Sequence, residues 1–69
     1  MNDREFLKQL GLKLKCQRIM VELSINDVAE KTGLHDSTIY KMEKGMKDFH
    51  VLNLRRLATV YGVEVKDLM

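Results

Sequence analysis

Residues 25–44 read INDVAEKTGLHDSTIYKMEK, and the spacing of the small and apolar residues in them indicates the local structure. Ala29 is followed four residues later by Gly33, and Ile39 comes six residues after that. The spacing predicts two short helices joined by a tight turn. Alanine lets a second helix come near, and glycine costs little where φ is positive. Ile39 and Met42, one turn apart, form the expected buried stripe of the second helix.

Two helices in this arrangement are typical of a helix-turn-helix, whose second helix enters the major groove of DNA. The interpretation depends on spacing, because the charge of the chain is only weakly informative. The formal net charge is +2 at pH 7, and many nucleic-acid-binding domains are more basic. Basic residues nevertheless gather at the carboxyl end of the second helix and just beyond it, at Lys41, Lys44 and Lys47.

Length and composition limit the classes of protein to which the chain can belong. Its 69 residues predict one globular domain over 1–69, with 45% hydrophobic and 32% charged residues and no proline. The charged amino terminus and the lack of long apolar runs predict a cytoplasmic protein that does not enter membranes. Cys16 is the single cysteine, and no metal-ligand spacing, phosphate loop or acid–base pair occurs. We therefore expect no enzyme activity and no cofactor.

Capping signals predict where the helices begin and end. Asn2, followed by Glu5, has capping-box spacing and begins a first helix that continues to about Met20. Ser24, followed by Asp27, repeats this signal. One face of the first helix carries the apolar residues Phe6, Leu10 and Leu14.

The remaining boundaries follow from the same rules. A second helix is predicted over 25–31 and a third over 36–44, with Gly45 as its stop. A fourth helix ends at Gly62, and its apolar stripe consists of Val51, Leu54, Leu57, Ala58 and Tyr61. A last turn or short fifth helix contains Val65, Leu68 and Met69. The predicted fold is all-α, with four to five helices and the helix-turn-helix at 25–44.

The chain resembles the Xre family of helix-turn-helix transcriptional regulators, which share the fold of the phage lambda repressor and Cro. The similar segments lie in register over nearly the whole chain and read LGLKLK (10–15), Arg18, ELS (22–24), VAEKTGL (28–34), STIYKMEKG (37–45), LRRLATVYGV (54–63) and VKDLM (65–69). The resemblance implies a compact lambda-repressor-like domain that binds operator DNA, commonly as a homodimer.

The resemblance also implies an ion pair between Arg18 and Glu43. The matching residues of the family tie the first helix to the third through a partly buried guanidinium–carboxylate contact. Such a pair can form two parallel hydrogen bonds, which fixes its geometry. Phosphate would repel Glu43, which favours this structural role over a direct DNA contact.

By correspondence with the motif, the base-reading candidates are Asp36, Ser37 and Lys41, flanked by Thr38 and Tyr40. Lys41 either donates to guanine O6 and N7 or contacts a phosphate. Asp36 either accepts from cytosine N4 or complements the positive end of the helix dipole.

The phosphate-binding candidates are Lys15, Ser24, Lys44 and Lys47, together with the N–H groups at the start of the second helix. The chain departs from the family at two positions. Ile25 stands where glutamine is usual, and Phe49 stands where proline is common. The first departure removes a common phosphate hydrogen bond.

Two functions from different classes remain open. The first is a transcriptional regulator, for example a repressor, that acts as a homodimer on two-fold symmetric, double-stranded DNA. The second is a protein-interaction module on the same fold, such as an antitoxin-type protein with a protein partner. Apolar residues near the carboxyl terminus form either the dimer interface or a cap on the core of their own subunit; they are Val63, Val65, Leu68 and Met69.

Overall fold

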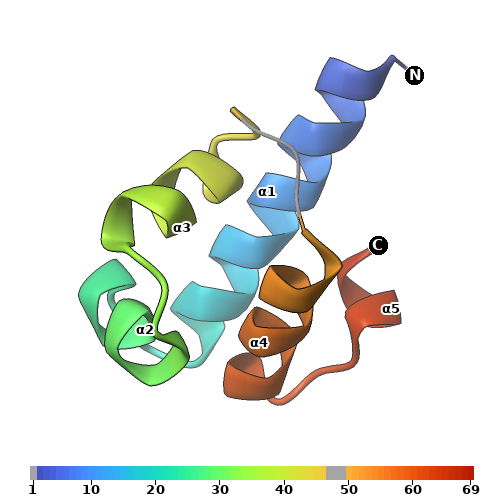
Figure 1. The fold of residues 1–69 in the computed structure, drawn as a ribbon. Helices are drawn as coiled ribbons and strands as arrows, with labels where there is room; N and C mark the ends of the chain where they lie inside the picture. Colours follow the sequence, from blue (N-terminus) through green and yellow to red (C-terminus); the bar gives the residue numbers. More distant parts are fainter. Residues whose placement is uncertain (1, 47–49) are drawn as a thin grey trace.

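Helices account for all the regular secondary structure that the computed structural model describes, which covers residues 2–46 and 50–69. They are α1 (Asp3–Met20), α2 (Ile25–Thr32), α3 (Asp36–Glu43), α4 (Val51–Tyr61) and α5 (Val65–Leu68). The helix-turn-helix, α2 and α3, lies on one side of α1 (Figure 1). Helices α4 and α5 also pack against α1. This arrangement confirms the predicted all-α fold. None of the described helices is long and apolar enough to cross a membrane.

Local hydrogen bonds set the helix ends at the predicted residues. The Asn2 side chain accepts from the backbone N–H of Glu5 at 2.8 Å, and α1 begins there. Ser24 and Asp27 form a reciprocal capping box at the start of α2, with distances of 3.0 and 2.9 Å. Gly33 ends α2 with a φ of +78°, a conformation that glycine adopts without steric cost. The predicted caps and the glycine turn are confirmed.

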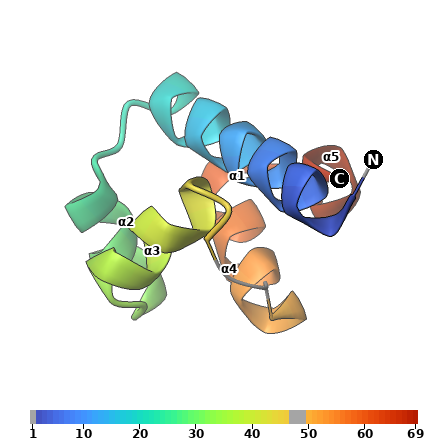
Figure 2. The same ribbon diagram turned by 90° about the horizontal axis from the view of Figure 1, so that it is seen from above.

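The core forms where the buried faces of the helices meet. Figure 2 shows α3 seated between α1 and α2, and α3 packs against both of them. Ile39 and Met42, the predicted stripe of α3, are fully buried together with Val28 of α2. The other buried hydrophobic residues are Leu10, Leu14, Leu54, Leu57, Ala58, Tyr61 and Leu68.

The structure corrects three expectations about burial. Phe6 is 45% exposed, because the first turns of α1 extend beyond α3 and α4 (Figure 1). Val51 is 74% exposed, since it begins α4 one turn before the first buried residue of that helix. Leu68, offered as a dimer residue, is fully buried in the core of its own subunit, so its side chain is not available to a partner.

Gly11 allows the close crossing of α1 and α3, and sequence periodicity gave no sign of it. A Cβ built at Gly11 would collide with the backbone carbonyl of Met42 and lie 2.6 Å from that of Glu43. Real Cβ atoms essentially never come so near, so only glycine admits the end of α3 at this point. The crossing places Glu43 beside Arg18, about two turns farther along α1.

Candidate nucleic-acid interface

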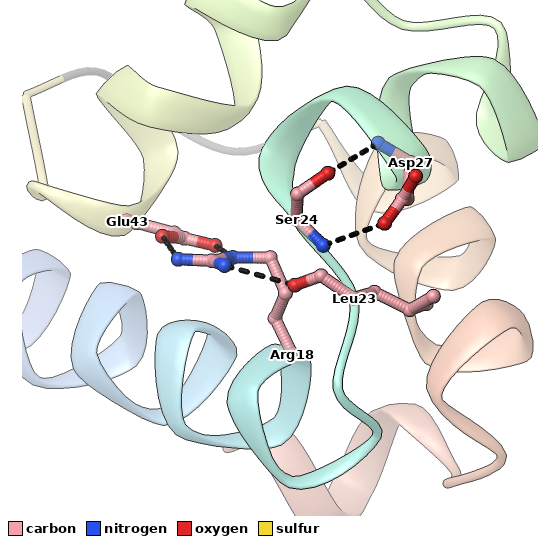
Figure 3. A network of polar contacts seen from close by, with 5 residues as sticks. All are labelled: Arg18, Leu23, Ser24, Asp27 and Glu43. Atoms are coloured by element: carbon pink, nitrogen blue, oxygen red, sulfur yellow. Dashed lines mark hydrogen bonds and ion pairs between the residues drawn. The ribbon is translucent and has the colours of Figure 1, made fainter.

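The ion pair between Arg18 and Glu43 fixes α3 against α1. The guanidinium donates from Nε to Oε2 at 2.8 Å and from Nη2 to Oε1 at 3.1 Å, while Nη1 donates to the Leu23 carbonyl at 3.0 Å (Figure 3). The side chains of Arg18 and Glu43 are only 13% and 4% exposed. The hydrogen bond to Glu43 raises the pKa of Arg18. Both charges are therefore held inside the fold, as the resemblance implies, and the pair orients the helix that carries the base-reading candidates.

The exposed side of α3 forms a continuous arc. At about 100° per helical residue, five exposed residues cover roughly 140° of the helix circumference. They are Asp36, Ser37, Tyr40, Lys41 and Lys44. The opposite side carries the buried Ile39, Met42 and Glu43. The helix thus presents a polar face to an external partner while its other face is held by the core.

Two adjoining hollows join this face of α3 to the ends of α1 and α2. The first is lined by Ser24, Ile25 and Asn26 from the start of α2 and by Asp36, Ser37 and Tyr40 from α3. The second shares Arg18, Ile25 and Tyr40 with the first. It adds Glu43, Leu12 and three lysines, which are Lys8, Lys15 and Lys44. We call the surface made by these two hollows and Lys41 the α3 face. Base candidates and phosphate candidates from three helices meet on it.

The α3 face is more basic than the chain as a whole. Lys8 and Lys15 of α1, Lys41 of α3 and Lys44 directly after α3 contribute positive charge. Asp36 supplies the carboxylate among the exposed residues of the α3 arc, and Glu43 is paired with Arg18. A small net charge therefore conceals a local basic surface, which is what attraction to phosphates requires.

Short-range contacts position the polar side chains on this face and leave one of them, Ser24, with a proton to donate. The Ser24 hydroxyl accepts the Asp27 N–H, so its own proton remains free to donate to a phosphate. Asp36 Oδ1 accepts the N–H of Ser37 at 2.7 Å, a contact that complements the amino terminus of α3. The Lys44 ammonium lies 5.6 Å from the centre of the Tyr40 ring, within the range of a cation–π contact.

Other residues considered for DNA contacts are not on the exposed arc of α3. Thr38 is half-buried and lies outside the exposed arc of α3. Lys47 and Phe49 lie outside the described residues. Ile25, which stands where the family usually has glutamine, is half-buried and packs against the core while lining both hollows.

Sequence reasoning missed three residues of the α3 face, namely Asn26, Lys8 and the exposed Leu12. Asn26 follows Ile25 in the first turn of α2 and lines the first hollow. Lys8 lines the second hollow, and its backbone lies against Gly45, where a Cβ would come within 2.7 Å of it. A signal for Lys8 existed, because Lys8 and Lys15 are two helical turns apart and so share a face of α1. Asn26 carried no such signal.

The residues near the carboxyl terminus divide between the core and the surface. Val63 and Val65 are half-buried and pack against the core, and Met69 is 61% exposed. Met69 and Val65 also line an apolar hollow together with Phe6, Val51 and Leu54. We call this surface the apolar end. Its residues come from α1, α4 and the carboxyl-terminal segment, so only the fold brings them together.

Comparison with known proteins places this geometry in a family. The sequence profile of the HTH_3 helix-turn-helix family matches residues 4–68. A relative from Methanocaldococcus jannaschii, described as an uncharacterized HTH-type transcriptional regulator, is 34% identical over 56 residues, which are 81% of this chain and 85% of the relative.

Solved structures agree with the family match. The restriction-modification controller protein C.AhdI from Aeromonas hydrophila has a TM-score of 0.91 at 28% identity, over 94% of this chain and 98% of its own. The BldD DNA-binding domain from S. venezulae has a TM-score of 0.84 at 36% identity, over 94% and 97% of the two chains. With its profile match, its relatives and its helix-turn-helix all in agreement, the chain belongs to the HTH_3 helix-turn-helix family of DNA-binding regulators.

Proposed function

We propose that the protein is a sequence-specific transcriptional regulator that inserts α3 into the major groove of a two-fold symmetric operator. The observation that supports this most directly is the α3 face. Its exposed polar arc adjoins the capped start of α2 and is flanked by lysines of α1. The regulators and the DNA-binding domain among the similar proteins support the same function.

Within this proposal, Ser37 and Lys41 are the principal base contacts. Both are exposed and lie one turn apart on α3, and a lysine can donate to guanine O6 and N7. Tyr40 contributes an apolar ring beside them. Asp36 is assigned to the helix terminus, because its carboxylate already accepts the Ser37 N–H.

Phosphate binding is assigned to groups at the rim of the α3 face. Lys15 and Lys44 line the second hollow, and Ser24 stands at the start of α2 with a free hydroxyl proton. The first N–H groups of α2 also face outward at this end, where the helix dipole favours an anion. These contacts set the docking of α3 and carry no sequence information of their own.

We further propose that the protein binds its operator as a homodimer through the apolar end. Phe6, Val51 and Met69 expose large apolar side chains there, and Val65 joins them at the surface. An isologous dimer would present two α3 helices to half-sites about 34 Å apart.

A protein-interaction module on the same fold is the alternative function, and the similar proteins do not favour it. The salt dependence of binding affinity distinguishes the two functions. Binding through several lysines weakens steeply as salt rises, because counterions are released from DNA, whereas binding through an apolar protein surface does not.

Binding-site selection from random duplex DNA tests the regulator function. Wild type, Lys41→Ala and Lys31→Ala are compared at two salt concentrations. Lys31 is an exposed lysine outside the α3 face and serves as the matched control. We expect wild type and Lys31→Ala to enrich one palindrome, and Lys41→Ala to lose or relax it at one position in each half-site. Folded protein that enriches no sequence at either salt concentration would overturn the proposal.

A further inference from the structure

A separate hollow lies between α2 and α4, and it shares no lining residue with the hollows of the α3 face. Lys31 comes from the last turn of α2, and Leu52, Arg55, Arg56 and Val60 come from α4. We call it the α2–α4 hollow. DNA binding through the α3 face does not use any of these side chains.

The α2–α4 hollow is positively charged and contains no carboxylate. Lys31, Arg55 and Arg56 line it together. Among the described residues, the ion pairs join Arg18 to Glu43 and Lys66 to Glu64, so none of the three cations is paired there. Three like charges around one hollow repel one another, and an anionic partner would relieve that repulsion.

Apolar surface accompanies this charge. Leu52 is 63% exposed although it is a leucine on a helix whose other side supplies four core residues. Arg55 and Arg56 follow Leu52 by three and four residues, so the three side chains form one patch on the outward side of α4. Val60 adds a half-buried apolar surface to the same hollow.

The combination of charge and apolar surface favours a protein partner over nucleic acid. A nucleic-acid backbone presents phosphates and sugars and has no large apolar group to cover the exposed leucine. An acidic protein segment supplies both kinds of group, because carboxylates pair bidentately with arginine while an apolar side chain covers Leu52.

We propose that the α2–α4 hollow binds an acidic segment of a partner protein, in which carboxylates flank a large apolar side chain. The proposal goes beyond operator binding. Because the α2–α4 hollow and the α3 face have no lining residue in common, we expect one molecule to hold DNA and the acidic partner at the same time. Such a contact would connect the bound regulator to a second protein.

The test is a titration of the full chain with a labelled peptide of sequence SDELDDLEDS, in the absence of DNA. Control peptides are SNQLNNLQNS, which lacks the charge, and SDESDDSEDS, which lacks the leucines. We expect saturable binding of the first peptide and binding about tenfold weaker or worse for each control. Amide resonances of Lys31, Leu52, Arg55 and Arg56 should shift in the ¹⁵N NMR spectrum.

Variants matched in charge identify the surface. Arg55→Ala/Arg56→Ala should weaken peptide binding about tenfold or more, whereas Lys15→Ala/Lys44→Ala, which also removes two cations, should leave it unchanged. All four residues are exposed, so both variants keep the core.

Three results would overturn the proposal. The first is no binding of the acidic peptide, and the second is binding that both double variants weaken equally. The third is a titration in which a short DNA duplex shifts the same four amides more than those of α3, which would make the hollow a nucleic-acid surface. Since the peptide titration contains no DNA, its outcome is independent of whether the regulator function holds.

Discussion

Two charged side chains, Arg18 and Glu43, are held almost out of solvent where α1 meets α3. Desolvation of the charges is unfavourable, and two parallel hydrogen bonds with a third to the Leu23 carbonyl offset that cost. The ion pair therefore contributes to stability only while both partners are present. Since it orients α3, the same contact supports the geometry of the α3 face.

Glu43→Gln tests this dependence. Glutamine keeps the size of the side chain but leaves the Arg18 guanidinium without its counterion, so we expect the free energy of unfolding to fall by about 3 kcal/mol. Urea denaturation measures the change. The double variant Arg18→Met/Glu43→Met removes both charges and should recover most of the loss. Equal or greater instability in the double variant would show that the pair is not coupled.

Tyr61, unlike Arg18 and Glu43, buries a neutral polar group that has no partner in the described part of the chain. Its side chain is buried at 4% exposure, and its hydroxyl has no hydrogen-bond partner among the described residues. Burial, with a smaller effect from the charge of Glu43, raises the pKa of Tyr61 to about 12. The folded protein therefore holds this proton more tightly than the unfolded chain, whose tyrosine titrates near its ordinary pKa of 10.0.

The raised pKa of Tyr61 gives stability a pH dependence with a definite sign. The contribution is fully present below pH 10 and is lost as the pH rises toward 12, by about 2–3 kcal/mol at about 1.4 kcal/mol per pKa unit. Urea denaturation of wild type and Tyr61→Phe across this range isolates it from the titration of lysines. We expect the wild type to lose more stability than the variant. Parallel curves would contradict the prediction.

Gly11 shows how one residue sets the distance between two helices. Gly11→Ala improves helix propensity by up to about 1 kcal/mol, yet its Cβ would meet the backbone of Met42 and Glu43. Backbone cannot move aside as a flexible side chain can, so we expect a net loss of about 2 kcal/mol. Gln9→Ala, at an exposed position of the same helix, is the control and should be nearly neutral in urea denaturation. A stabilised Gly11→Ala protein would mean that the helices can separate without cost.

The described helices were largely predictable, because their signals are local. Asn2 and the Ser24–Asp27 box satisfy N–H groups within a few residues of themselves, and Gly33 supplies the positive φ of the turn. The candidate site was predictable only in part. The motif named Ser37, Lys41 and other residues of α3, while Asn26 and Lys8 join the α3 face through the approach of α2 and α1 to that helix.

For the whole molecule, the salt dependence of operator affinity reports how many phosphates the α3 face neutralises. Lys44→Ala should reduce the slope of log affinity against log salt by about one unit. The loss should be similar for all DNA sequences, since phosphate contacts are not base-specific. Lys31→Ala should leave the slope unchanged because Lys31 lies in the α2–α4 hollow. Fluorescence polarisation with the selected operator measures both. A salt slope that Lys44→Ala leaves intact would remove this residue from the interface.

The proposed dimer has its own test at the apolar end. Met69→Glu places a charge at an exposed apolar position and should dissociate the dimer in sedimentation experiments. Affinity for the full operator should fall by about tenfold or more, while affinity for an isolated half-site stays unchanged. Met20→Glu, the same change at an exposed methionine in the last turn of α1, outside the apolar end, controls for added negative charge. A protein that remains dimeric with Met69→Glu would place the interface elsewhere.

The order of the residues is enough to define the helices, their caps, the glycine turn and the buried stripe of α3, because each depends on contacts within one or two turns. Packing in three dimensions decides the rest. It leaves Phe6 and Val51 exposed, buries Leu68 in its own subunit and brings Lys31 and Arg55 to the lining of one hollow. These outcomes depend on the angles and distances at which helices cross. Those are fixed by close approaches such as that at Gly11, between residues far apart in the chain.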